Sequence, residues 1–124
     1  MNLKTAIARF DTLYPNSVPY EEKVAWVAEL DGLVLAELVC AQGGTAPEGT
    51  ELPYTLATPG STVLLLPFPY DTLYVEYLSM KTELLCGDIT RYNNASTLVA
   101  RTYEAFCHYY TRTHLPPLRT SIRV

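Results

Sequence analysis

Histidine, cysteine and long hydrophobic runs are scarce in this sequence of 124 residues, and each shortage removes a class of protein. Two histidines and three cysteines show no HExxH or CxxC spacing, so neither a zinc site nor a disulfide framework is expected. The longest apolar run, 63–69, is too short to cross a membrane. Residues 1–5 lack the hydrophobic stretch of a signal peptide. The odd number of cysteines, without CxxC spacing, favours buried, inert thiols in a reducing cytoplasm.

Residues with catalytic potential are equally scarce. The sequence contains no P-loop, no nucleophile elbow and no dinucleotide-binding glycine pattern. His108 lies off the apolar face of the last predicted helix, and His114 lies at the end of that helix, where it suits the negative end of the dipole. Catalysis needs several such groups in one place, so we expect no enzymatic activity, no cofactor and no metal.

The chain is rich in tyrosine and carries its charge unevenly. Ten tyrosines dominate the aromatic residues, beside three phenylalanines and one tryptophan. Residues 1–87 carry four basic and eleven acidic side chains, a net charge of −7, whereas residues 88–124 carry five arginines and two acidic side chains, a net charge of +3. This division fits either a solvated helix surface or head-to-tail association between copies, which can close into a ring.

Hydrophobic periodicity predicts four helices and hence an all-α, four-helix bundle-like domain. The expected helices cover residues 2–14, 19–39, 70–86 and 88–114. A single connecting glycine, Gly87, makes the last two helices a tight antiparallel hairpin. The last helix repeats an apolar, aromatic or small side chain every three or four residues, as a coiled-coil-like seam does. The seam consists of Ile89, Tyr92, Ser96, Val99, Tyr103, Phe106 and Tyr110.

A long glycine- and proline-rich loop, residues 41–62, separates the second and third predicted helices. Two short runs, 54–57 and 62–66, have the composition of strands and would form a small β-hairpin. Residues 1–114 are therefore predicted to be one helical domain, followed by an extended C-terminal tail at residues 115–124.

The tyrosines of the last two helices admit two interpretations. Tyrosine is enriched at half-buried surfaces, so these residues could form an interface between subunits. The alternative is a tyrosine-lined core with the hydroxyl groups at its rim. Under the first interpretation, the interface combines tyrosines with the arginines of the basic segment. Its candidate residues are Tyr70, Tyr74, Tyr77, Arg91, Arg101, Tyr109, Arg112, Arg119 and Arg123.

Three segments resemble motifs of small prophage proteins. Pro67–Tyr74 is similar to their PxPYDxLY signature, Gly87–Asn94 to their GxxxRYNN turn, and Tyr109–Pro116 to their YxRTHxP ending. Over about residues 63–117, the chain thus resembles head–tail connector proteins of tailed phages, also called adaptor or head-completion proteins.

This resemblance implies a structural protein that forms a ring, typically of twelve copies, beneath the portal protein. Its other partners would be stopper and tail proteins, contacted through the loop 41–62 and the tail 115–124. DNA would pass through the lumen without specific binding, because an acidic lining does not hold phosphate. The resemblance implies neither a cofactor nor a membrane. It implies the host bacterial cytoplasm during assembly and the virion head–tail junction afterwards.

A different class, a phage DNA-packaging or regulatory helical protein that binds DNA or terminase, is the alternative. Such a protein needs a basic surface. Arg91, Arg101 and Arg112 are the candidates, because offsets of ten and eleven residues place them roughly on one face of a helix.

Overall fold

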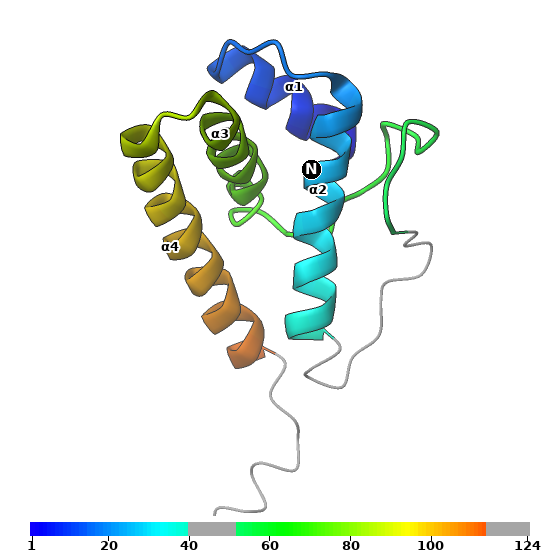
Figure 1. Ribbon diagram of the computed structural model, residues 1–124. Coiled ribbons are helices and arrows are strands. Elements are labelled where there is room, and N and C mark those ends of the chain that lie inside the picture. The colour runs from blue at the N-terminus through cyan, green and yellow to red at the C-terminus, as the bar shows by residue number, and fades with distance from the viewer. Residues whose placement is uncertain (40–51, 114–124) are drawn as a thin grey trace, which may run out of the picture.

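The computed structural model describes residues 1–39 and 52–113, and this part of the chain is all-α with no strand (Figure 1). It confirms the predicted bundle-like class. Helix α1 lies across one end of the molecule, α2 and α4 run from that end toward the other, and α3 runs back toward it (Figure 1). The elements are α1 (Leu3–Leu13), α2 (Tyr20–Val34), the π-helical segment η1 (Leu35–Val39), α3 (Thr72–Cys86) and α4 (Ile89–Thr113).

Helix α1 begins and ends where the sequence indicates. The side-chain Oδ1 of Asn2 accepts a hydrogen bond from the backbone N–H of Thr5 at 2.7 Å, which caps the first turn. The last turn closes through the N–H of Tyr14, which donates to the carbonyl of Phe10, and Pro15 follows. The residue before a proline avoids helical backbone angles, so Pro15 sets this boundary.

The second and third predicted helices are shorter than the periodicity suggests. Helix α2 ends at Val34, where the N–H of Leu35 is shared between the carbonyls of Asp31 and Gly32 and the chain continues as the π-helical η1. Helix α3 begins two residues later than predicted. The N–H of Tyr70 is used in a turn to the carbonyl of Pro67, so this residue precedes the helix instead of starting it.

The predicted β-hairpin is wrong. Residues 54–58 form a turn, and Val63 makes an isolated antiparallel bridge with Asn2 at the beginning of the chain. Leu64 and Leu66 point into the core, and the N–H groups of Leu65 and Leu66 bond to side chains of the helices. The backbone donors of this run are thus satisfied without a second strand. Residues 41–51 of the predicted loop lie outside the described residues.

The core lies between α1, α2 and α3. Helix α4 contributes one fully buried side chain, Phe106, although the helix is 25 residues long. Its predicted seam is half-buried from Tyr92 to Tyr110, while Ile89 at its beginning is 74% exposed. Among the described helical elements, α4 contacts only α3 and η1, so it has one neighbour along most of its length. The seam is therefore half-buried from its second member onward and completely buried at Phe106 alone.

The connection between α3 and α4 has the predicted geometry. Gly87 adopts a left-handed conformation with φ +77°, and its N–H bonds to the carbonyls of Glu83 and Leu84. Asp88 Oδ1 accepts a hydrogen bond from the N–H of Arg91 at 3.0 Å and caps α4.

None of the described helices combines the length and hydropathy that a membrane span requires.

Candidate functional site

Two of the predicted interface tyrosines lie in the core, so the prediction is wrong for them. Tyr74 has no exposed surface, and Tyr77 is 7% exposed. The Tyr74 hydroxyl donates to Asp31 Oδ1 at 2.6 Å and accepts from the N–H of Leu66 at 2.8 Å. A buried tyrosine needs a partner for its hydroxyl, and α2 supplies a carboxylate at the right depth. These residues cannot contact another subunit while the domain is folded.

The buried carboxylate of Asp31 joins three parts of the molecule. Besides Tyr74 on α3, its Oδ2 accepts from the Tyr54 hydroxyl at 2.7 Å and from the N–H of Leu65 at 3.3 Å. Burial raises the pKa of Asp31, against the lowering effect of the three donors. Burial beside this carboxylate also raises the pKa of the Tyr54 and Tyr74 hydroxyls. The group is a structural connection between α2, α3 and the segment 52–71.

Two further tyrosines bond to acidic side chains on the same stretch of chain. Tyr77 donates to Glu29 on α2, which also pairs with Lys81 Nζ at 2.9 Å. The Tyr77 hydroxyl is the main cause of the lowered pKa of Glu29. Tyr103 of α4 donates to Glu37 of η1 at 3.0 Å. The tyrosine excess is thus partly explained by hydrogen bonds to carboxylates along α2 and η1.

Tyr70 and Tyr109 are the predicted interface tyrosines that stay partly exposed. The ring of Tyr70 packs against Tyr109 and Phe106, with centroids 5.1 and 5.5 Å apart. This aromatic cluster attaches the second half of α4 to the chain segment that leads into α3. Their exposed edges leave both rings accessible from outside, in contrast to Tyr74.

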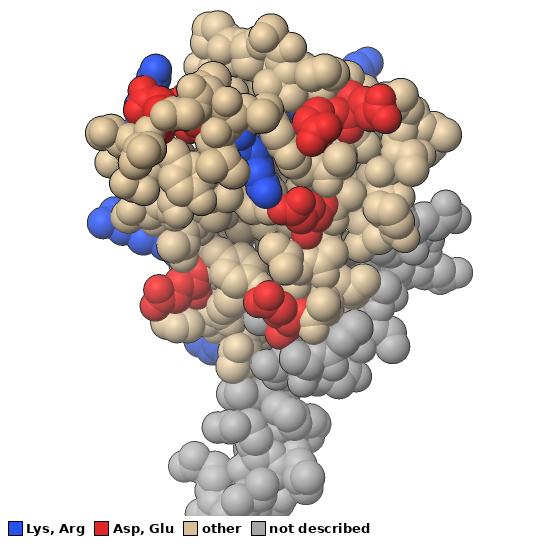
Figure 2. Space-filling view, in the orientation of Figure 1, with Lys and Arg blue, Asp and Glu red and all other residues tan. Residues whose placement is uncertain are grey.

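The described arginines of the basic segment lie on α4 but do different things. Arg91 Nε lies 3.8 Å from Glu83 Oε2, so this residue is paired with α3. Arg101 and Arg112 are exposed. On the face seen in Figure 2, basic side chains occur along the edge formed by α4, and acidic side chains recur down α2. Arg119 and Arg123 lie outside the described residues.

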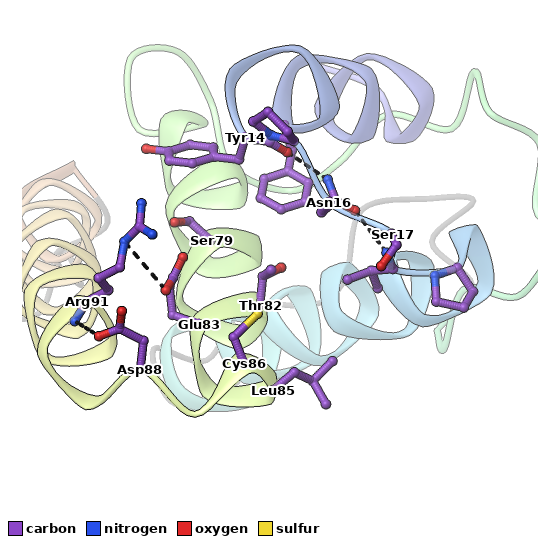
Figure 3. Close-up of a pocket in the computed structure, with 14 residues that line it drawn as sticks. Tyr14, Asn16, Ser17, Ser79, Thr82, Glu83, Leu85, Cys86, Asp88 and Arg91 are labelled. Carbon is purple, nitrogen blue, oxygen red and sulfur yellow. Dashed lines mark hydrogen bonds and ion pairs between the residues drawn. The ribbon is translucent and has the colours of Figure 1, made fainter.

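A cleft of about 690 Å³ lies at the end of the molecule where α3 turns into α4 (Figure 3). One wall is the connection between α1 and α2, residues 14–19, and the other is the last half of α3 with the start of α4. Its volume is in the range of sites that take small ligands or peptide segments. The cleft is lined by Phe10, Tyr14, Pro15, Asn16, Ser17, Val18, Pro19, Ser79, Thr82, Glu83, Leu85, Cys86, Asp88 and Arg91.

The cleft exposes several side chains that periodicity placed in a core. Leu85 is 67% exposed and Tyr14 is 41% exposed. Cys86 is exposed as well, so the prediction that the thiols are buried is wrong for this residue, because the end of α3 has no covering helix there. Cys107 is partly buried, which raises the pKa of its thiol, and Cys40 lies outside the described residues.

A smaller neighbouring cleft, of about 260 Å³, continues between α3 and α4 and shares Tyr14, Glu83 and Arg91 with the first. Glu76 lies in its floor. Its Oε1 is buried without a hydrogen-bond partner, while its carboxylate accepts a hydrogen bond from Thr102. Burial raises the pKa of Glu76. No group of three or more metal-ligating His, Cys, Asp or Glu side chains occurs in residues 1–39 and 52–113.

The cleft and the Asp31 contacts were not predicted from the sequence. Asp31 is an acidic residue in an apolar helix, and the chain as a whole is rich in tyrosine. An acidic side chain in an apolar helix, in a chain that offers many hydroxyl donors, is the signal for a buried hydrogen-bonded carboxylate. The cleft gives no comparable signal, because its two walls are far apart in the chain and neither has a distinctive motif.

The three segments Pro67–Tyr74, Gly87–Asn94 and Tyr109–Pro116 have local roles in the fold where the structure describes them. Pro67–Tyr74 forms the turn into α3 and supplies the tyrosine bound to Asp31. Gly87–Asn94 forms the connection to α4, and Tyr109 begins the segment that anchors the end of α4. Comparisons with protein-family models, curated proteins and solved structures find no match to this chain.

Proposed function

We propose that this protein is a structural subunit that forms a ring at the head–tail junction of a tailed phage or prophage, as an adaptor bound to the portal protein. The observation that carries the proposal is the position of α4 at the edge of the domain, where it has few neighbouring helices. This helix bears Arg101 and Arg112 on its exposed surface and packs only against α3 and η1 among the described elements. The resemblance of residues 63–117 to connector proteins agrees with it.

The arrangement suits association between copies. Residues 1–87 carry a net charge of −7 and residues 88–124 a net charge of +3, so the basic edge of one copy complements the acidic surface of the next. Such contacts join two different surfaces, and a series of them closes into a ring when the rotation between copies is suitable. About twelve copies would surround the DNA, with an acidic lining that lets the duplex pass.

The alternative, a DNA-packaging or regulatory protein, has weaker support in the contacts. Its binding surface needs Arg91, Arg101 and Arg112 together. Arg91 is within 3.8 Å of Glu83, so part of its charge is compensated within the chain. Two exposed arginines on a chain with a net charge of −4 make a small basic surface for a duplex.

Electron microscopy of the purified chain mixed with the portal protein of a tailed phage or prophage tests the proposal. We expect a ring of additional density on one end of the portal. Arg101→Glu combined with Arg112→Glu should prevent ring formation, because it reverses the charge of the contact. Arg9→Glu, an exposed charge reversal on α1, is the control and should leave the ring intact.

Failure to bind the portal would contradict the proposed role. Binding to duplex DNA that weakens steeply with salt and is lost in the Arg101→Glu and Arg112→Glu variant would instead support the alternative. Both measurements use the full chain.

A further inference from the structure

The cleft at the α3–α4 connection combines an apolar, aromatic wall with an acidic rim. Tyr14 stacks on Phe10 with ring centroids 5.7 Å apart, and Pro15, Val18 and Pro19 continue this wall. Aromatic grooves of this kind bind proline-rich segments in the extended polyproline conformation, which costs little entropy to order.

The rim of the cleft carries more acidic than basic side chains. Glu83 and Asp88 line it, with Arg91 as the one basic lining residue. Because Arg91 pairs with Glu83, the carboxylate of Asp88 carries the uncompensated charge of this lining. Glu21 and Glu22 follow Tyr20 in the first turn of α2 and are exposed. A ligand that presents an arginine beside prolines therefore matches the cleft in charge as well as in shape.

The chain itself contains such a segment. Residues 115–119 read Leu-Pro-Pro-Leu-Arg and follow α4 after one intervening residue. Residues 114–124 contain two arginines and no acidic residue. This segment lies outside the described residues, so it is compared with the cleft by its prolines and its charge alone.

The segment of the same copy cannot reach the cleft. Arg91 lines the cleft, and Thr113 ends α4 at its opposite end (Figure 1). At 1.5 Å per helical residue, these two residues are about 33 Å apart. The six residues from Thr113 to Arg119 span at most about 22 Å when fully extended. A second copy must therefore supply the segment.

We propose that the cleft binds residues 115–119 of a second copy of this chain, with the prolines on the wall formed by Tyr14, Val18 and Pro19 and Arg119 at Asp88. The contact joins one end of each copy to the opposite end of the next. It rests on the proposed function in one respect, since it supplies a specific head-to-tail contact for the ring.

Sedimentation analysis of full-length variants tests this contact. Leu85→Asp places a charge on the apolar cleft surface, and Arg119→Glu reverses the charge of the segment. We expect each to weaken self-association at least tenfold, about 1.4 kcal/mol. Leu56→Asp is the matched control, because Leu56 is 59% exposed but lies in the segment 52–71 away from the cleft. It should associate like the unchanged protein.

Mixing the two variants gives the sharpest result. The Leu85→Asp chain keeps a working segment and the Arg119→Glu chain keeps a working cleft, so the mixture should form a heterodimer and stop there. Failure of the mixture to associate, or equal weakening by Leu56→Asp, would overturn the proposal.

Cys86 provides a second measurement that does not depend on oligomer formation. A synthetic peptide of residues 114–121 should slow alkylation of this exposed thiol at least threefold, measured by mass spectrometry of the individual cysteine peptides. Alkylation of Cys107 should not change, and a peptide with Pro116→Gly and Pro117→Gly should give no protection.

A monomeric full chain together with an unprotected Cys86 would reject this contact. Portal binding that persists in the Leu85→Asp chain would leave the proposed function intact. Conversely, an intact contact without portal binding would reject the head–tail role alone.

Discussion

The region formed by α1, α2 and α3 differs sharply from α4 in how completely its side chains are buried. In the first region, apolar side chains of three helices and of the segment 52–71 are buried together around the hydrogen-bonded carboxylate of Asp31. In α4, a longer helix buries only Phe106 completely. Much of the surface of α4 therefore stays exposed, while the first region buries its apolar side chains within the domain.

This difference predicts where substitutions destabilise the fold. Changes in the α1–α3 region act on the whole domain, because each buried group there connects several elements. Changes on α4 act on one helix and on what it binds. The following variants test that division.

The largest effect is expected at Asp31. Asp31→Leu leaves the hydroxyls of Tyr54 and Tyr74 and the N–H of Leu65 without their acceptor, which we expect to cost about 3–5 kcal/mol in free energy of unfolding. Denaturant unfolding followed by circular dichroism measures it.

Asp31→Asn removes the charge of this side chain and keeps its shape. The amide keeps an acceptor oxygen, so we expect a smaller loss than for leucine. Glu104→Leu, at an exposed position on α4, is the control and should change stability by less than about 0.5 kcal/mol. Equal stability of the Asp31→Leu chain and the unchanged chain would show that the buried contacts do not hold the domain together.

A smaller and more local effect is expected at Phe106. Phe106→Ala removes the buried ring that contacts Tyr70 and Tyr110, at a cost near the lower end of the 3–5 kcal/mol typical of such changes. Hydrogen exchange should accelerate along α4 and remain slow in α2, since α4 does not contact α2. Leu98→Ala, at a side chain that is 45% exposed, is the matched control. Uniform acceleration in both helices would contradict the division.

The sequence predicts the helices well where local signals are strong. Asn2, Pro15, Gly87 and Asp88 fix helix ends through short-range geometry, and these boundaries agree with the structure. The hairpin fails because the run 62–66 has strand-like composition but finds its partners elsewhere. The N–H groups of Leu64 and Leu65 bond to Met1 and Asp31, which are far away in the chain, and the N–H of Leu66 bonds to the Tyr74 hydroxyl.

The tyrosines of the candidate site likewise show that local sequence does not reveal hydrogen-bond partners far away in the chain. Helical periodicity places Tyr70, Tyr74 and Tyr77 on one face, and that face does pack inward. Whether a tyrosine is buried or exposed depends on an acceptor for its hydroxyl. Glu29 and Asp31 provide acceptors on a helix some 40 residues earlier, and local sequence cannot show this.

Two substitutions of tyrosine by phenylalanine compare how much a tyrosine hydroxyl stabilises each region. Tyr77→Phe removes the hydrogen bond to Glu29 at a nearly buried position, and we expect a loss of about 1 kcal/mol. Tyr103→Phe removes the bond to the exposed carboxylate of Glu37, where water can replace the hydroxyl, so we expect about half as much or less. Thermal unfolding of both variants gives the comparison. A larger loss for Tyr103→Phe would reverse the proposed order of the two regions.

The smallest effect concerns Glu76, which lies between the two regions on the side of α3 that faces α4. Burial raises its pKa above the ordinary value of 4.5, so the folded protein holds this proton more tightly than the unfolded chain. The contribution of Glu76 to stability therefore decreases as pH rises through the window above 4.5. Glu76→Gln removes this dependence and should raise the melting temperature at pH 7 by a few degrees or less.

The melting-temperature advantage of Glu76→Gln should shrink as pH falls and disappear below about pH 4, where the native carboxyl is protonated in both states. Glu104→Gln, which makes the same change of charge on the exposed face of α4, separates this effect from net charge. An advantage that is the same at pH 4 and pH 7 would mean that the desolvated charge of Glu76 is not its cause. The α3–α4 contact would then be limited by packing alone, and filling the smaller cleft would be the way to strengthen it.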